Sequence, residues 1–142
     1  MRKDRDESGR KTLSGNWVIV MKHILLVDDV STNLKCVNLI LKNKYNLTMV
    51  KSGREALDIL KSVIPDLVLL DIHMQEMDGY EVMEHMNENP ETAKIPVILL
   101  TADSEKRSEE RGNALGAVGF IRKPFEPQVL LDQIEEVWKM EE

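Results

Sequence analysis

The chain has 142 residues, of which 42% are apolar and 31% charged, a composition typical of one folded domain rather than of a disordered or fibrous protein. Its formal net charge of −6 disfavours direct nucleic-acid binding, because a phosphate backbone attracts clustered Lys and Arg. The single cysteine, Cys36, excludes an internal disulfide and a cysteine-cluster metal site, so we expect a small buried residue in a cytoplasmic protein.

The first 20 residues differ from the rest. Residues 1–11 carry five basic and three acidic side chains and almost no apolar ones, which predicts a flexible leader. Because Met21 directly precedes the first strand-like run, this leader is either native or an extension ahead of an alternative start. Its one apolar piece, Trp17–Val20, could dock on the domain or pair with a sheet edge. No apolar run reaches the ~20 residues that span a bilayer, so we expect no membrane contact and divide the chain into a leader (1–20) and a domain (21–142).

From Lys22 onward, five short apolar runs alternate with amphipathic stretches. This alternation predicts five βα pairs and a parallel sheet. Continuous hydrophobicity is typical of strands that are covered on both faces. The predicted strands are Ile24–Val27, Leu47–Val50, Leu67–Leu70, Val97–Leu100 and Gly119–Ile121.

The helices are predicted from apolar spacing and from capping signals. The first and last helices carry stripes that should face the sheet, formed by Leu34, Val37 and Leu41 and by Leu130, Ile134 and Val137. Capping boxes for the second and third helices are predicted from Ser52 with Glu55 and Asp78 with Glu81, and Pro127 suits the first turn of the last helix. The helix after the fourth strand is the least clearly marked, because three glycines punctuate that region: Gly112, Gly116 and Gly119.

Five chemically active side chains follow the predicted strands at one edge of the sheet. They are Asp28 and Asp29 after the first strand, Asp71 after the third, Thr101 after the fourth and Lys123 beyond the fifth. Open parallel sheets bind ligands at this edge. Three clustered carboxylates repel one another unless a hard cation lies between them, and Mg²⁺ is the best candidate because it also binds phosphate oxygens. With a hydroxyl donor and an ammonium group beside it, the set predicts a phosphoryl site.

Each of these residues also has a purely structural explanation. An Asp pair after a strand commonly forms a turn or a helix cap, a Thr suits a strand end, and a Lys before Pro is usually on the surface. Their joint placement after strands one, three, four and five of one alternating pattern favours the functional reading.

Four segments make the sequence similar to a known family: LLVDD at 25–29, LVLLDIHMQEMDGYE at 67–81, PVILLTA at 96–102 and GFIRKPF at 119–125. Over Lys22–Met140 the chain resembles the receiver domains of two-component response regulators. The resemblance implies an α/β fold of the flavodoxin-like, doubly wound (βα)5 type, with five parallel strands in the order 2-1-3-4-5. The family often has proline where this sequence has Gln75, which predicts a less rigid loop after Asp71.

By this resemblance, Asp71 is the nucleophile that accepts a phosphoryl group from a sensor histidine kinase or a histidine phosphotransfer protein. Asp29, Asp71 and the backbone carbonyl of His73 would ligate Mg²⁺. Asp28 would hold the ion through water or orient the site. The implied function is a phosphoacceptor switch that assists its own phosphorylation and dephosphorylation, rather than an enzyme.

The resemblance also implies how the phosphoryl group is read. Lys123 would pair with it, Thr101 would donate a hydrogen bond to it, and the bond between Lys123 and Pro124 would be cis. Phe120 would be the aromatic switch, although a buried core ring is the simpler explanation of that residue. A downstream protein would then bind the face made by the fourth helix, fifth strand and fifth helix.

Other functions fit the sequence less well. A phosphatase of the haloacid dehalogenase type needs a second Asp two residues after its nucleophile, but those positions hold Val30, Ser31 and His73. The turn DDVSTN after the first strand has no glycines that would let a backbone approach a pyrophosphate. A phosphate-independent scaffold stays possible, though it would not need all five site residues.

The remaining histidines and methionines suggest no further cofactor site. We expect His23 and His85 at surface positions, and Met74, Met77, Met83 and Met86 as core or interface residues. Whether the chain is a stand-alone receiver or part of a longer regulator stays open, because the last helix could continue past Glu142.

Overall fold

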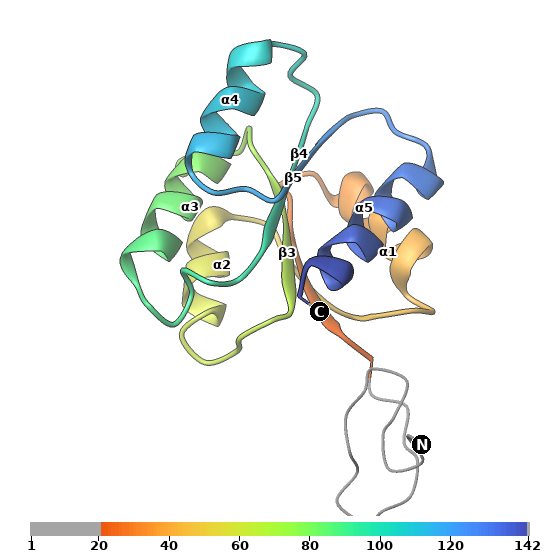
Figure 1. The fold of residues 1–142 in the computed structure, drawn as a ribbon, viewed down its shortest axis with the longest axis horizontal. Helices are drawn as coiled ribbons and strands as arrows, with labels where there is room; N and C mark the ends of the chain where they lie inside the picture. Colours follow the sequence, from red (N-terminus) through yellow and green to blue (C-terminus); the bar gives the residue numbers. More distant parts are fainter. Residues whose placement is uncertain (1–20, 142) are drawn as a thin grey trace, which may run out of the picture.

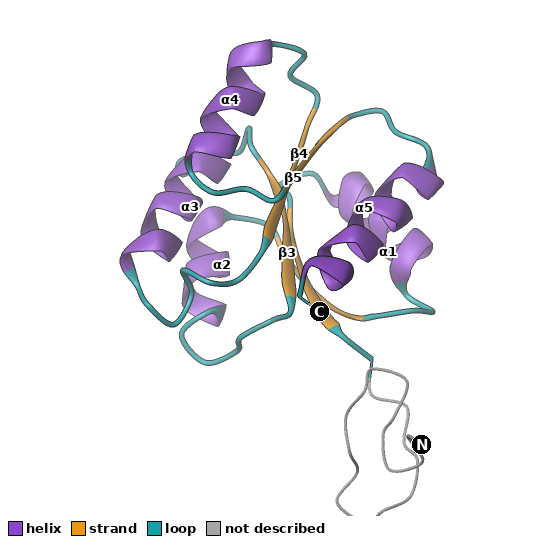
Figure 2. Cartoon of the chain, in the orientation of Figure 1, coloured by secondary structure: helices purple, strands orange, loops and turns teal. Residues whose placement is uncertain are grey.

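The computed structural model describes residues 21–141, in which five strands alternate with five helices (Figures 1 and 2). The strands are β1 (His23–Val27), β2 (Asn46–Val50), β3 (Leu67–Asp71), β4 (Val97–Thr101) and β5 (Gly119–Arg122). The helices are α1 (Ser31–Leu41), α2 (Gly53–Ile59), α3 (Gly79–Glu88), α4 (Lys106–Ala114) and α5 (Pro127–Met140). Each predicted strand is confirmed and is longer than predicted by one residue. The predicted leader, with Trp17–Val20, lies outside the described residues.

The strands form one parallel sheet in the order β2-β1-β3-β4-β5, as the resemblance implied. Figure 1 shows α1 and α5 on one face of the sheet and α2, α3 and α4 on the other. The connection that follows β1 therefore runs to one face of the sheet, and the connection that follows its neighbour β3 runs to the opposite face. Such a reversal opens a crevice at the carboxyl ends of the two strands, where ligands bind in folds of this kind.

Two apolar clusters fill the space between the sheet and its helices. Successive strand residues point to opposite faces, so each continuous apolar run feeds both clusters. Under α1 and α5, both predicted stripes are buried: Leu34, Val37, Leu41, Leu130, Ile134 and Val137. On the other face Met83 and Met86 are buried, while Met74 and Met77 pack at the edge of the cluster. The predictions for the stripes and the methionines are thus confirmed.

The capping signals are confirmed for α3 and α5 and only in part for α2. Asp78 and Glu81 form the predicted capping box, and Pro127 lies in the first turn of α5. Ser52 accepts a hydrogen bond from the Glu55 N–H, but the Glu55 carboxylate accepts one from the Ser52 hydroxyl rather than from the backbone. The second capping box is therefore incomplete.

The prediction that Cys36 is buried is wrong, because its side chain is exposed on α1. It follows Leu34 by two residues, which places it roughly 200° around the helix from that buried side chain. Among the histidines, His85 is exposed as predicted, whereas His23 is half-buried and its Nε2 lies 2.7 Å from the Thr48 hydroxyl. No helix within residues 21–141 has the length and apolar content needed to cross a membrane.

Candidate functional site

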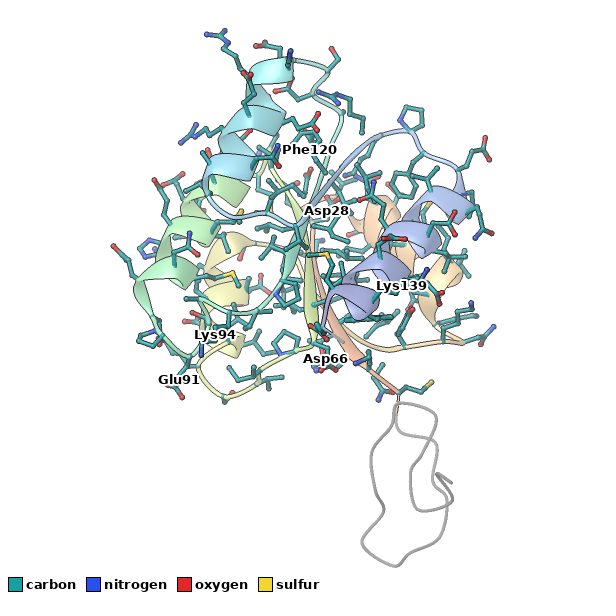
Figure 3. The ribbon with its side chains drawn as sticks, viewed as in Figure 1. Asp28, Asp66, Glu91, Lys94, Phe120 and Lys139 are labelled. Carbon is teal, nitrogen blue, oxygen red and sulfur yellow. The ribbon has the colours of Figure 1, made fainter. Side chains whose placement is uncertain are left out.

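Three carboxylates meet at the carboxyl edge of the sheet. Asp28 and Asp29 directly follow β1, and Asp71 is the last residue of β3. One oxygen from each lies within 4.8 Å of the other two. Asp28 and Asp71 are only 5% and 6% exposed, and Asp29 is half-buried. Figure 3 shows Asp28 at this edge and Asp66, which precedes β3, at the opposite edge.

Backbone groups of the neighbouring loops fix this acidic cluster. The Val30 N–H donates to Asp28 Oδ1 at 2.9 Å, and the Gln75 N–H donates to Asp29 Oδ2 at 3.2 Å. Gly79 begins α3 so close to Asp71 that an added Cβ would lie 2.5 Å from the Asp71 carbonyl oxygen. Only glycine permits this approach, which brings the start of α3 directly under the site.

Lys123 supplies the positive charge of the site. Its Nζ lies 2.8 Å from Asp28 Oδ2 and 3.5 Å from Asp71 Oδ1. Its backbone N–H donates to the Thr101 carbonyl at 2.7 Å, and the following peptide bond to Pro124 is cis, as expected. One ammonium group cannot neutralise three carboxylates, so the cluster keeps a net negative charge that favours a cation.

The electrostatics single out Asp71. Burial is the main cause that raises the pKa of its carboxyl to about 6; Lys123 lowers this pKa, and the neighbouring Asp28 and Asp29 add to the rise. Without a cation, ionised Asp71 is therefore disfavoured, and a bound cation would relieve both the burial and the repulsion.

Thr101 ends β4 beside this cluster. Asp71 is paired with Leu100 across β3 and β4, so Thr101 lies one residue further along the neighbouring strand. Its side chain is fully buried and its Oγ1 accepts a hydrogen bond from the Asp103 N–H at 3.1 Å. Within residues 21–141 the hydroxyl proton has no acceptor. Since buried donors are normally paired, this orphaned proton at the sheet edge indicates room for an acceptor from a ligand.

Sequence reasoning missed one residue of this region, Asp103. Its Oδ2 accepts a 2.6 Å hydrogen bond from the Ser108 hydroxyl and lies 3.1 Å from Nε2 of His73. Its Oδ1 accepts from the Glu105 N–H at 2.7 Å. The bonds from Ser108, Glu105 and His73, in that order, lower the pKa of Asp103 to about 2. The only signal was local: an Asp two residues before a helix cap commonly forms such a turn.

The remaining predicted residues, His73 and Phe120, lie close to the site. The His73 ring is exposed and reaches Asp103, whereas the predicted role of its carbonyl as a metal ligand stays a prediction. Phe120 lies on β5 (Figure 3), half-buried against the cluster beneath α4. The Arg122 guanidinium lies 5.1 Å from the centroid of its ring.

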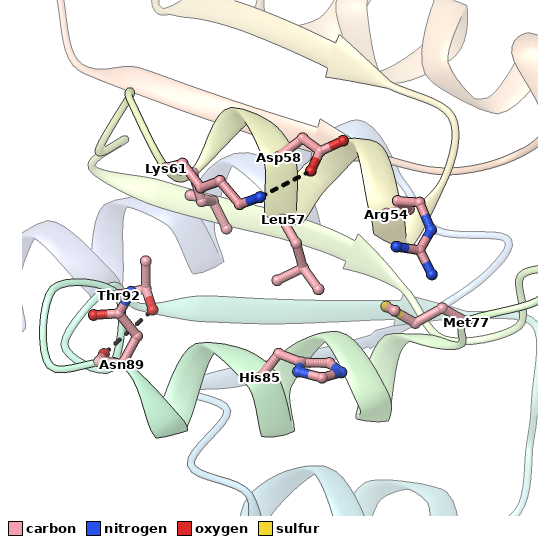
Figure 4. Close-up of a pocket in the computed structure, with 9 residues that line it drawn as sticks. Arg54, Leu57, Asp58, Lys61, Met77, His85, Asn89 and Thr92 are labelled. Carbon is pink, nitrogen blue, oxygen red and sulfur yellow. Dashed lines mark hydrogen bonds and ion pairs between the residues drawn. The ribbon is translucent and has the colours of Figure 1, made fainter.

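A separate pocket of about 340 Å³ lies between α2 and α3 (Figure 4). None of its lining residues belongs to the predicted phosphoryl site, although Met77 comes from the loop that follows Asp71. The pocket is lined by Arg54, Leu57, Asp58, Leu60, Lys61, Met77, His85, Asn89 and Thr92.

Comparisons with known proteins agree with this geometry. The family model of the response regulator receiver domain matches residues 24–135. A probable cyclic di-GMP phosphodiesterase of Vibrio cholerae is 42% identical over 111 residues, which are 78% of this chain but only 25% of that relative. The polar-differentiation response regulator DivK of Brucella ovis is 35% identical over 115 residues, covering 80% of this chain and 94% of DivK.

A solved structure shows the same likeness. The signal receiver domain of a signal transduction histidine kinase from Syntrophus aciditrophicus has a TM-score of 0.76 and 36% identity, covering 83% of this chain and 90% of that one. Receiver domains thus occur among the relatives both as nearly whole proteins and as parts of longer ones.

Proposed function

This chain belongs to the receiver-domain family of response regulators, and we propose that Asp71 is the carboxylate on which it accepts a phosphoryl group. Receiver domains act in two-component signalling as phosphoacceptors. The observation that carries the assignment is the position of Asp71: nearly buried, at the carboxyl end of β3, 3.5 Å from the Lys123 ammonium and within the carboxylate cluster.

The residues at this edge fit Mg²⁺. Asp28, Asp29 and Asp71 offer the clustered oxygen ligands that hard cations prefer, and their net negative charge is offset only in part by Lys123. We propose that Asp29, Asp71 and the His73 carbonyl bind the ion, while Asp28 holds it through water or orients the site. When bound, Mg²⁺ would supply positive charge to the oxygens of an incoming phosphoryl group.

Each side chain of the site then has a separate role in the transfer of the phosphoryl group. An oxygen of Asp71 forms a bond to phosphorus while the bond from phosphorus to the histidine nitrogen of the donor breaks, and the imidazole keeps that electron pair. The Lys123 ammonium stabilises the negative phosphoryl oxygens. The Thr101 hydroxyl, which donates to no acceptor within residues 21–141, donates to one of these oxygens once the group is attached.

We propose partners and a setting that follow from this chemistry. The donor is a sensor histidine kinase or a histidine phosphotransfer protein, and the reader is a downstream protein that binds the α4, β5 and α5 face. The domain spans residues 21–142 behind a leader of residues 1–20, and it works in the cytoplasm as a phosphoacceptor rather than as an enzyme. Direct binding to nucleic acid or membrane is not part of the proposal.

Labelling with acetyl phosphate tests the assignment. The wild type should gain the mass of one phosphoryl group when Mg²⁺ is present, and Asp71→Asn should gain none. Asp58→Asn is the matched control, because Asp58 is an exposed carboxylate on α2 that pairs with Lys61 away from the site. Intact-protein mass spectrometry measures the label. Unchanged labelling of Asp71→Asn contradicts the acceptor, and labelling in excess chelator contradicts the role of the metal.

A further inference from the structure

Polar contacts hold the first turn of helix α4 to the rest of the domain. Gly112 is the only buried residue of this helix, so α4 has no apolar stripe facing the core. Its first turn is bonded from two other elements instead: the Tyr80 hydroxyl donates to the Ser108 carbonyl at 2.9 Å, and the Arg122 guanidinium donates to the Glu105 carbonyl at 3.2 Å. Each such bond contributes only about 1 kcal/mol, so the first turn of α4 can change position at a low cost in free energy.

Asp103 connects this first turn directly to Thr101. Its N–H donates to the Thr101 Oγ1, and its carboxylate accepts the 2.6 Å bond from the Ser108 hydroxyl. The same carboxylate contacts His73 in the loop that follows Asp71. Three segments therefore meet at one residue: the end of β4 at its backbone N–H, and the start of α4 and the loop after β3 at its carboxylate.

We propose that Asp103 is a positioning residue that carries a displacement of Thr101 into the first turn of α4 through Ser108. The proposal rests on the proposed function, since the displacement occurs when Thr101 donates to a phosphoryl group on Asp71. The N–H of Asp103 bonds to the moving hydroxyl oxygen, and only one residue, Ala102, separates the two. Asp103 must therefore follow Thr101.

The Ser108 bond decides whether α4 follows Asp103. It is short and has an ionised acceptor, which makes it one of the stronger bonds that hold the helix. If it holds, the first turn of α4 moves with Asp103. If Asp103 only stabilises its own turn through the Glu105 N–H, the displacement ends in the loop and α4 stays in place. The two cases differ in how α4 responds to phosphorylation.

Hydrogen exchange of the α4 backbone separates these cases. Amide exchange of Lys106–Ala114 is measured by mass spectrometry in the full chain, with Mg²⁺ alone and with Mg²⁺ and beryllofluoride as a phosphoryl mimic. In the wild type, beryllofluoride should change the exchange of α4. In Ser108→Ala this change should fall to less than half, while the affinity for beryllofluoride stays equal to that of the wild type or becomes tighter, because α4 no longer has to move.

The matched control is Ser104→Ala. Ser104 is an exposed serine in the same loop with no hydrogen bond to another described residue, so this variant should respond like the wild type. Asp103→Asn is a second variant that keeps the N–H bond to Thr101 and weakens the acceptor for Ser108. It should reduce the α4 response as well, which preserves the test if Ser108→Ala folds poorly.

The possible results are distinguishable. A full α4 response in Ser108→Ala and Asp103→Asn, or a loss in Ser104→Ala, overturns the role of Asp103. Beryllofluoride binding to the wild type with no change in α4 overturns it too, and leaves the proposed function intact. Absence of beryllofluoride binding to the wild type contradicts the proposed function, and the role of Asp103 falls with it.

Discussion

At the scale of single residues, the raised pKa of Asp71 has a consequence for stability. The pKa of about 6 in the folded protein lies above its ordinary value of 3.8. Protonated Asp71 therefore stabilises the fold. This stabilisation is fully present below a pH of about 4 and is lost as the pH rises through about 6. At pH 7 the metal-free protein carries an ionised carboxylate that burial and its acidic neighbours disfavour.

Asp71→Asn should for this reason stabilise the metal-free protein at pH 7 by about 1 to 3 kcal/mol and have little effect near pH 4. Urea unfolding in excess chelator at both pH values measures the difference. Asp58→Asn, which removes an exposed carboxylate, should change stability by less than about 0.5 kcal/mol at either pH. An Asn variant that is less stable at pH 7, or equally stabilised at both pH values, contradicts the cost of burying this charge.

The residues that sequence reasoning could predict are those placed by strand ends. Parallel strands bring their carboxyl ends to one edge, so Asp28, Asp29, Asp71 and Lys123 had to meet once the strands were known. The contact between His73 and Asp103 could not be predicted, because it joins two loops 30 residues apart and no periodic pattern fixes a loop contact. The exposure of Cys36 follows from its helical phase relative to Leu34 and Val37, which the average burial of cysteine does not reflect.

At the scale of elements, the loop between β3 and α3 holds a strained turn. Glu76 has a φ of 68°, and around it the Met77 N–H donates to the Gln75 carbonyl at 2.8 Å. This is a γ-turn with a left-handed central residue, an arrangement that costs a residue with a Cβ about 1 to 2 kcal/mol. The turn lies beside the site, since the Gln75 N–H donates to Asp29.

Glu76→Gly should therefore stabilise the protein by about 0.5 to 1 kcal/mol, because glycine adopts positive φ without steric cost but loses more entropy on folding. Gln75→Gly is the control at the adjacent position, which has no positive φ, and it should be neutral or destabilising. Thermal unfolding in chelator measures both. If Glu76→Gly is no more stable than Gln75→Gly, the turn is not strained.

Element boundaries were predictable where a chemical signal marks them. Asp78 with Glu81 and Pro127 fixed helix starts correctly, because capping chemistry is local. Helix α4 was the least clear from sequence, and the structure gives the reason: its contacts with the sheet depend on Gly112, where an added Cβ would lie 2.5 Å from Leu99 Cδ1. A helix that packs closely through a glycine needs no stripe of apolar residues. The spacing of apolar residues in the sequence therefore does not predict this helix.

At the scale of the whole molecule, the proposed site and the proposed partner face are joined by β4 and β5. Thr101 ends β4 at the site, and it is paired in register with Arg122 on β5. Arg122 and Phe120 lie on the same face of β5, which faces α4, since side chains alternate along a strand. The Arg122 guanidinium reaches Glu109 of α4 at 3.2 Å. We therefore predict that a change at Thr101 also reaches the surface through Arg122 and the ring of Phe120.

The Phe120 ring is placed to respond to such a change. The ring is already half-buried, so inward movement can bury only the surface that is still exposed. This burial contributes a fraction of the roughly 1.5 to 3 kcal/mol that is typical of fully burying a Phe side chain. Phe120 has no hydroxyl, so apolar burial rather than a hydrogen bond must favour the inward state. A bias of about 1 kcal/mol still changes the ratio of two states roughly fivefold.

Phe120→Ala should leave labelling by acetyl phosphate close to that of the wild type but weaken the response of the α4, β5 and α5 face. Amide NMR spectra with and without beryllofluoride measure that response. Phe125→Ala is the matched control, because Phe125 packs against the cluster under α1 and α5 on the opposite side of the sheet. Its shifts on α4 and β5 should match those of the wild type. Equal shifts in the wild type and Phe120→Ala would remove Phe120 from the mechanism, and an equal loss in Phe125→Ala would indicate general loosening of the domain instead of a switch at β5.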